Sequence, residues 1–193
     1  IATSAVVADI LATVPDVNES SIRSYMGAPA FVVDKRTVRR RTAADGWPPV
    51  PPLNSVRGVF HPRPDEFRIA FPVTADLLRG SGQKLHAAPA TALGVHPGSE
   101  RTFTGTPCDV IVYWRLFSAT GAGVGSLRPI AAALEAQLGD TLVFVFNARD
   151  ATVAVQRIAP ADRRGRLAAL VGPLTPSPRA ALAHAVGCQL HEL

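Results

Sequence analysis

The chain has 193 residues, which suffices for one medium domain or for a small domain joined to a larger one. Apolar residues make up 47% of it, so the composition excludes disorder over most of the length. No apolar run approaches the roughly 18 residues of a spanning helix, and the net charge of +5 is informative only through its distribution.

A first helix is predicted over about Ser4–Val14. Apolar side chains recur there at the three- and four-residue spacing of one buried helical face, at Val6, Val7, Ile10, Leu11 and Val14. Pro15-Asp16 then ends the helix.

A second helix is predicted to begin at Asn18, a residue type that caps helix N-termini well. Its apolar residues share one face, at Ile22, Tyr25 and Met26. The polar residues lie mostly off that face, at Ser20, Ser21, Arg23 and Ser24. We therefore expect Arg23 to be exposed while Ile22 and Met26 are buried.

A short hairpin is predicted next, from Phe31-Val32-Val33, a polar turn at Asp34-Lys35 and a second strand over residues 36–41. Segment 31–41 carries five bases against the single acid Asp34, namely Lys35, Arg36, Arg39, Arg40 and Arg41. In an alternating strand Arg39 and Arg41 share a face and Arg40 opposes them. Two helices and a basic hairpin predict a winged unit over residues 1–43.

Residues 43–52 hold four prolines and a glycine, which predicts a Pro-rich linker over 44–54. After it, β-like runs alternate with short helix-like stretches, and residues 55–158 predict a β-rich, barrel-like α+β domain. Strands are expected at 55–60, 66–71, 108–117, 141–146 and 152–158, and helices at 74–78, 87–93 and 127–137. Residues 159–193 predict a helical extension, with helices at 163–171 and 178–186.

The stretch VADILATVPDVNESSIRSYM resembles the helix-turn-helix of many bacterial regulators and of the DNA-reading region of sigma factors. The resemblance covers about 25 residues, or about 40 with the hairpin, and departs from the pattern where Pro15-Asp16 replaces the usual turn glycine. It implies a recognition helix that presents Ser20, Ser21, Arg23 and Ser24 to a major groove, with wing arginines on phosphates. A helix-turn-helix that binds protein, or a structural helical cap, is the alternative.

The stretches FPVTADLLRGSGQKL and GSLRPIAAALEAQLGDTLVFVFNARDATVAVQRI resemble the DNA-binding pseudobarrel of plant transcription factors and of some restriction-enzyme recognition domains. The resemblance implies a closed or nearly closed barrel over 55–158 with one DNA-facing edge. The candidates for that edge are the loop residues Arg79, Ser81, Gln83 and Lys84 and the neighbouring Arg115. Surface arginines beside turn glycines remain the alternative, and such a barrel also suits a peptide or a small ligand.

The glycine-rich segment GAGVGS at 121–126 lies between a predicted strand and a predicted helix, as in a nucleotide-binding turn. Its spacing is not Gly-x-Gly-x-x-Gly, and no Gly-Lys-Ser/Thr follows. A flexible loop, or a backbone contact to a phosphate, therefore fits the segment better.

No motif for catalysis or metal binding stands out. The five histidines are scattered, and Cys108 and Cys188 have no partner at metal spacing, so no cofactor, metal site or disulfide is expected. Lys35 and Lys84 are the only lysines among 20 basic residues, and this arginine bias suits phosphate recognition but also marks a GC-rich genome.

We therefore expect a DNA-binding module of a larger, cytoplasmic bacterial protein, such as a regulator, a polymerase-associated factor or a restriction or defence component. The partner is double-stranded DNA, with a protein partner or missing domains of the same chain as further candidates and no membrane. The initial Ile1 in place of Met suggests a fragment, although processing would leave the same trace, and the first residues lack the basic flank and cleavage pattern of a secretory signal. The alternatives are a protein-interaction module, or an enzyme with a site in 74–128 that uses Asp76, Arg79, His86 and Arg115.

Overall fold

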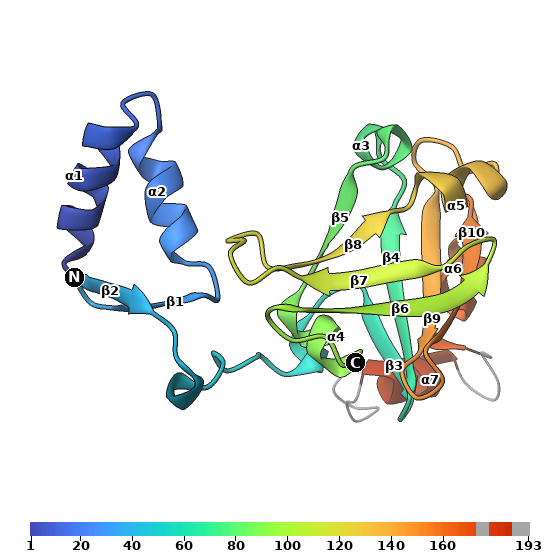
Figure 1. Cartoon of the computed structure of the whole chain (residues 1–193). Helices are drawn as coiled ribbons and strands as arrows, with labels where there is room; N and C mark the ends of the chain where they lie inside the picture. The colour runs from blue at the N-terminus through green and yellow to red at the C-terminus, as the bar shows by residue number, and fades with distance from the viewer. Residues whose placement is uncertain (173–177, 187–193) are drawn as a thin grey trace.

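The computed structural model describes residues 1–172 and 178–186, which form two parts joined by a linker (Figure 1). The first part, residues 1–42, is the helical unit: two helices that stand on a two-stranded hairpin. The second part is a curled, eight-stranded sheet, the half-barrel, with its own helices. The chain is thus a mixed α+β protein, as the sequence predicts.

The two helices of the helical unit form where the apolar periodicity places them, as α1 (Thr3–Thr13) and α2 (Glu19–Met26). Oδ1 of Asn18 accepts a hydrogen bond from the amide of Ser20 at 2.8 Å and so caps α2. Ile22 and Met26 are buried and Arg23 is exposed, which confirms the predicted orientation of α2.

Two apolar residues of this region do not join the core as predicted. Tyr25 is 62% exposed, because the buried face of α2 is centred on Ile22 and Met26 and Tyr25 is rotated by about 100° from Met26. Val14 is 50% exposed, because α1 ends one residue before it.

The predicted hairpin is confirmed. β1 (Phe31–Asp34) pairs antiparallel with β2 (Thr37–Arg40), which leaves Lys35 and Arg36 as the two turn residues. Val38 is the buried residue of β2 and packs with Val7, Ile22 and Met26 in the small core of the helical unit.

Between β2 and β3 the chain forms only two short 3₁₀ turns, η1 (Ala43–Asp45) and η2 (Leu53–Ser55). This agrees with the proline content of the segment, since proline lacks the amide hydrogen that helices and strands require.

The half-barrel consists of eight strands in the order β3-β4-β9-β10-β6-β7-β8-β5. Their bounds are β3 (Val59–Arg63), β4 (Glu66–Pro72), β5 (Gly82–Leu85), β6 (Ser99–Thr106), β7 (Val110–Trp114), β8 (Ala122–Ser126), β9 (Thr141–Asn147) and β10 (Thr152–Ile158). Neighbouring strands are antiparallel except β10 and β6, which are parallel. The sequence predicts β10 with its observed bounds and β3, β4, β7 and β9 with different ends, and it misses β5, β6 and β8.

The sheet is curled but does not close, so the structure shows a half-barrel where the sequence predicts a closed or nearly closed barrel. β3 and β5 are its two edges, and no ladder joins them within the described ranges 1–172 and 178–186. Pro62 in β3 has no amide hydrogen to donate, and the register shifts between Phe60 and Arg63. β5 has four residues and a second register shift, so neither edge offers a regular ladder for the other.

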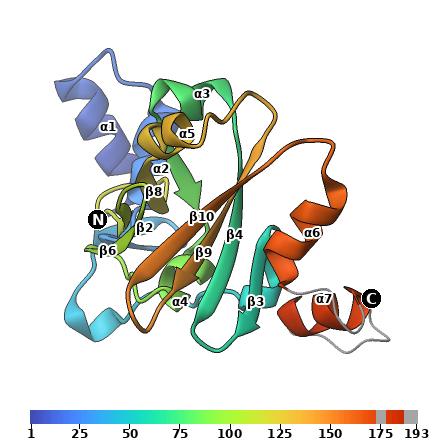
Figure 2. The ribbon, with the colours of Figure 1, turned by 90° about the vertical axis from the view of Figure 1, so that its right-hand side faces the viewer.

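Helices pack on both faces of the half-barrel. α3 (Ala75–Arg79) and α5 (Arg128–Ala133) lie together at one end, and α4 (Ala87–Ala92) lies toward the other (Figure 1). α6 (Arg163–Val171) and α7 (Pro178–Val186) cover the outside near β3 and β4 (Figure 2). β9 is therefore buried on both faces: Phe144 and Phe146 point into the main core, and Val143 packs against the α6 and α7 cluster. No helix in the described part of the chain is both long enough and apolar enough to cross a membrane.

Candidate nucleic-acid interface

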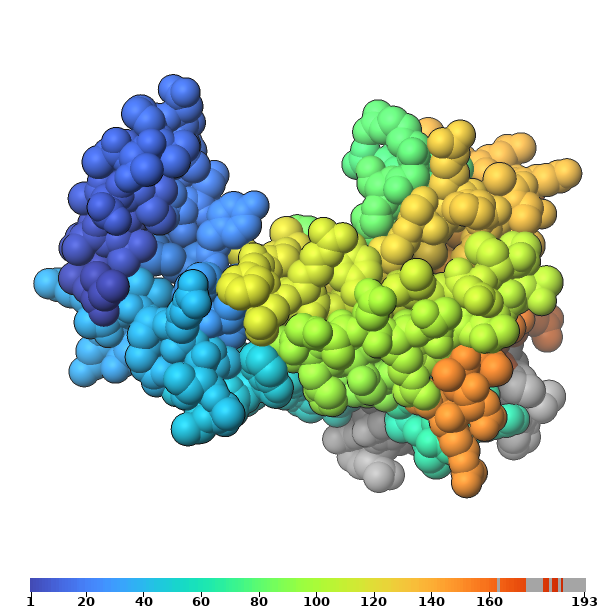
Figure 3. All heavy atoms as spheres, in the orientation of Figure 1, coloured from blue at the N-terminus to red at the C-terminus, as the bar shows by residue number. Residues whose placement is uncertain are grey.

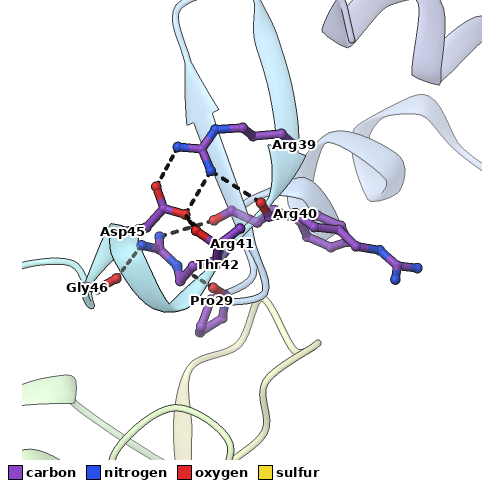
Figure 4. A network of polar contacts seen from close by, with 8 residues as sticks. Pro29, Arg39, Arg40, Arg41, Thr42, Asp45 and Gly46 are labelled. Atoms are coloured by element: carbon purple, nitrogen blue, oxygen red, sulfur yellow. Dashed lines mark hydrogen bonds and ion pairs between the residues drawn. The ribbon is translucent and has the colours of Figure 1, made fainter.

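Arg39 of the hairpin is held by an acid of the linker. Its guanidinium donates to both carboxylate oxygens of Asp45, at 2.7 and 2.5 Å (Figure 4). Asp45 also accepts hydrogen bonds from the amide and the hydroxyl of Thr42. The hydrogen bond from Arg39, together with those from Thr42, holds the pKa of Asp45 well below its ordinary value, and the same pair raises the pKa of Arg39. The charge of Arg39 is thus balanced by a largely buried carboxylate of the same chain, although the Arg39 side chain is itself 56% exposed.

The Arg41 guanidinium likewise makes its contacts within the chain. It donates to three backbone carbonyls, those of Pro29 at 2.7 Å, Phe31 at 3.1 Å and Gly46 at 2.6 Å. Its guanidinium carbon also lies 5.8 Å from the centroid of the Trp47 ring. Arg41 therefore fastens the start of the linker to the hairpin. Arg39 and Arg41 do share a face, as predicted.

Arg40 points away from this network (Figure 4). It is exposed, and no side chain of the described residues pairs with its guanidinium. Of the three consecutive arginines, Arg40 is thus the one whose charge is available to a partner.

The turn of the hairpin and α2 together form a basic groove. Arg23, Lys35 and Arg36 line a hollow of about 610 Å³, together with Thr3 and Ser4 at the start of α1. Lys35 and Arg36 are exposed and make no ion pair within the described part of the chain. Arg23 is 51% exposed and pairs with Glu19 of the same helix at 2.7 Å. The groove thus carries two unpaired cations and a third in an exposed ion pair, which water screens strongly.

The small polar residues of α2 flank this groove. Ser20 and Ser24 are exposed, as predicted, whereas Ser21 is half-buried. The exposed face of α2 therefore presents two hydroxyls and the guanidinium of Arg23, but also the carboxylate of Glu19.

The candidates of the half-barrel do not form a single loop. Arg79 ends α3 and makes an ion pair with Asp76, and Ser81 follows it, exposed, before β5. Gln83 and Lys84 belong to the edge strand β5, so the prediction of one turn that spans 79–84 is wrong. The chain joins the sheet at Gly82, which pairs with Ser126 of β8.

Arg115 lies apart from the other half-barrel candidates. It follows Trp114, which pairs with Ala122, and Ala122 pairs with Leu85 at the end of β5. Arg79 lies beyond the opposite end of β5, so these two arginines are at different ends of the sheet. Arg115 instead lies beside the helical unit, where it lines a hollow with Tyr25 of α2.

The basic groove is also remote from residues 79–84. The hairpin touches the half-barrel at its other end, where the amide of Ala30 donates to the carbonyl of Leu116 at 2.9 Å and the rings of Phe31 and Phe117 meet edge to face. The turn with Lys35 and Arg36 lies a strand length further away (Figure 1). Phosphates held at the basic groove therefore do not lie over β5.

The glycine-rich segment 121–126 is not a flexible loop. Residues 122–126 form β8, between β5 and β7, and the backbone groups of this strand pair with those two neighbours. Gly123 is buried, and a Cβ on it would lie 2.9 Å from the hydroxyl of Tyr113. Glycine is therefore required at position 123 because the Tyr113 side chain approaches the backbone closely there, and not because a phosphate binds.

The four residues of the enzyme alternative do not converge. Asp76 and Arg79 lie on α3 before β5, whereas His86 follows β5 and caps α4 through its ring nitrogen. Arg115 lies at the same end of the sheet as His86 but two strands away. No cluster of three His, Cys, Asp or Glu side chains suited to a metal ion occurs among the residues described, which leave out Cys188.

A group of exposed aromatic residues at the junction of the two parts is not predicted from the sequence. The sequence places Tyr25 on the apolar face of its helix and Phe117 in a strand, but both are 62% exposed and face the same hollow. No signal in the sequence distinguishes them from core residues, because their exposure depends on how the two parts meet.

Comparisons with protein families, with curated proteins and with solved structures found no match to this chain.

Proposed function

We propose that the helical unit binds double-stranded DNA, with α2 as the recognition helix of a helix-turn-helix and the β1–β2 hairpin as its wing. The observation that carries this proposal is the basic groove, in which Arg23 of α2 and Lys35 and Arg36 of the hairpin turn line one hollow. Cations from two elements that face one groove suit the phosphates of a backbone that runs past both elements.

The different contacts of the hairpin arginines support the same function. Arg39 and Arg41 fix the hairpin to the linker, so the turn that carries Lys35 and Arg36 is held on a rigid base. Preorganised cations lose less conformational entropy when they bind a phosphate. Arg40 adds a further free cation on the opposite face of β2.

The charge balance predicts weak, salt-sensitive binding by the isolated chain. Residues 1–46 hold six Lys and Arg against five Asp and Glu, so attraction to DNA depends on the local cluster rather than on a large net charge. This fits a module of a larger bacterial protein, a regulator, a polymerase-associated factor or a restriction or defence component, in which other parts add affinity.

The test is the affinity of the chain for fluorescent duplexes of unrelated sequence at one low salt concentration. The double variant Lys35→Ala/Arg36→Ala is expected to weaken binding to every duplex by a similar factor, because phosphate contacts carry no sequence information. The matched control is Arg57→Ala/Arg149→Ala, which removes two exposed arginines of the second part. Equal loss in both double variants, or none in either, would refute the proposed interface.

A second candidate function is docking of a protein partner on the helical unit. A hollow of about 410 Å³ opens between α1, α2 and the hairpin, and its lining is mainly apolar, with Ile10, Ile22 and Phe31 among its walls. Such a hollow accepts an apolar side chain of a partner. If the chain binds no DNA at any salt concentration but still binds a protein partner, this function is favoured over the first.

A further inference from the structure

We infer that the junction of the two parts binds unpaired nucleobases of a single-stranded stretch, through the juxtaposed side chains of Tyr25, Ile111, Tyr113, Arg115 and Phe117. These five residues are called the aromatic saddle. The inference rests on the proposed function, and it adds the class of nucleic acid, a duplex with an adjoining single strand.

The aromatic saddle is a wide hollow between α2 and the β7 side of the half-barrel. The volume of the hollow is about 850 Å³, and residues of both parts line it. Tyr25 comes from α2, the other four residues of the saddle come from β7 and the chain after it, and residues of β6 and β8 complete the walls. Figure 3 shows the surface falling away between the blue helical unit and the green-to-yellow half-barrel.

Large apolar side chains are concentrated here although they face solvent. Tyr25 and Phe117 are each 62% exposed, and Ile111 is 44% exposed. Trp47, 48% exposed, lines an adjoining hollow of about 350 Å³ together with Phe117. These four are half of the eight exposed large hydrophobic residues found in the described ranges 1–172 and 178–186. Exposed apolar residues that gather at one place mark a binding surface.

Glycines of two neighbouring strands lie under the Tyr113 side chain at the floor of the aromatic saddle. Gly123 of β8 is its partner in register, and a Cβ on Gly123 or on Gly82 would lie 2.9 or 3.2 Å from the Tyr113 hydroxyl. The ring therefore lies across the neighbouring strands. The guanidinium carbon of Arg115 lies 5.1 Å from the ring centroid, which places a planar cation at the surface of the floor.

Aromatic rings interleaved with arginines suit single strands better than other partners. Bases stack on aromatic rings and on guanidinium planes, while the cations attract the phosphates between them. Here Arg115 lies within the saddle, and the unpaired Arg40 lines the adjoining hollow with Trp47. Glu100, which pairs in register with Tyr113, supplies a carboxylate that accepts hydrogen bonds from exocyclic amino groups.

The position of the saddle relative to the basic groove fits a strand that leaves a duplex. Arg23 and Tyr25 are two residues apart on α2, so they point to nearly opposite sides of this helix. The two sites are thus separated by about one helix diameter, roughly 10–12 Å, which a strand spans in about three to four nucleotides.

The experiment compares three probes, namely a blunt duplex, the same duplex carrying a thymine overhang of about ten nucleotides, and that single strand alone. The length of the overhang is within the site sizes of single-strand-binding domains. The chain is expected to bind the overhang duplex at least about fivefold more tightly. Tyr25→Ala is expected to abolish this preference and to leave the blunt duplex unaffected, whereas Tyr25→Phe, which keeps the ring, preserves it. Leu138→Ala is the matched control, because Leu138 is 69% exposed and lies outside the saddle.

A fluorescent base provides the second readout. 2-Aminopurine in the overhang loses fluorescence when it stacks, so the wild-type chain is expected to quench it and Tyr25→Ala to quench it less. Phe117→Ala is expected to behave in the same way, but Phe117 also packs on Phe31, so Tyr25 carries the decisive comparison.

The outcomes separate this inference from the proposed function. Tight binding of the blunt duplex with no gain from the overhang overturns the aromatic saddle alone and indicates a protein or another ligand there. Tyr25-dependent binding of a single strand without binding of the blunt duplex overturns the duplex interface alone. Absence of binding to all three probes overturns both.

Discussion

The salt dependence of DNA binding distinguishes the free cations of the hairpin from the paired ones. Each phosphate contact that is lost lowers the slope of log affinity against log salt by about 0.9 for duplex DNA. Lys35→Ala/Arg36→Ala removes two unpaired cations and is therefore expected to lower the slope by about 1.8. Between about 50 and 200 mM salt, wild-type affinity then falls about twelvefold more than the affinity of this variant.

The matched comparison is Arg39→Ala/Asp45→Ala, which also removes a hairpin arginine. Arg39 is bound to Asp45 through two hydrogen bonds, so this double variant removes an internal ion pair and leaves the net charge unchanged. Its salt slope is expected to equal that of the wild type. The measurement is fluorescence anisotropy of one labelled duplex over a series of salt concentrations.

Two results would refute the reasoning. A fall of about 0.9 in the slope of Arg39→Ala/Asp45→Ala would mean that Arg39 leaves Asp45 and contacts a phosphate. An unchanged slope for Lys35→Ala/Arg36→Ala would remove the hairpin turn from the interface. The circular dichroism spectrum and melting temperature of each variant establish that it is folded.

The secondary structure of the helical unit could be predicted because local signals decide it. The apolar spacing over Val6, Val7 and Ile10 and the cap at Asn18 act within a few residues, and the hairpin follows from its two apolar runs and polar turn. The exposure of Tyr25 could not be predicted in the same way. A residue at the edge of an apolar stripe is buried only if another element covers it, and the half-barrel stops short of α2.

Three strands escaped prediction because their sequences lack an apolar alternation. β6 contains one fully buried side chain, Phe103, among Ser, Thr, Glu and Gly, and its half-buried Arg101 donates to the carbonyls of Leu93 and Ala148. β8 has a glycine at position 123 because the Tyr113 side chain crosses the strand there. In both strands the side chains that determine which residues fit lie far away in the sequence. The residue types of these strands are therefore explained only by the assembled sheet.

The sequence assigns the candidate interface to the hairpin, but its individual arginines could not be ranked from the sequence. Asp45, which holds Arg39, lies beyond the predicted boundary of the winged unit, in a segment chosen as linker for its prolines. The carbonyl of Gly46 and the ring of Trp47, which hold Arg41, lie there too. A charge run indicates where cations are, and their partners decide which of them remain free.

Two further predictions concern the stability of the half-barrel. Gly105→Ala is expected to lower the free energy of unfolding by about 1–3 kcal/mol in a denaturant titration, because the new Cβ would lie 2.3 Å from the carbonyl oxygen of Val153 where β6 meets β10. Gly125→Ala, whose Cβ would meet nothing closer than 3.7 Å, is the control, and equal effects of the two would contradict this account. The second concerns Asp140, 3% exposed, which accepts hydrogen bonds from the amide of Gln137 at 2.8 Å and from Arg157 at 2.6 Å. The amide first, and then Arg157, hold the pKa of Asp140 below its ordinary value in the folded protein. A carboxyl with a depressed folded pKa contributes stability above its unfolded pKa of about 3.9, and this contribution is lost as the pH falls through the folded value. The melting temperature of the wild type is therefore expected to fall more steeply below about pH 4 than that of Asp140→Asn, which has no carboxyl to titrate. Asp45→Asn serves as a separate comparison, because the pKa of Asp45 is also lowered in the folded protein. If the melting temperatures of the wild type and of Asp140→Asn fall in parallel down to about pH 2.5, the contacts of Asp140 do not favour its ionised form.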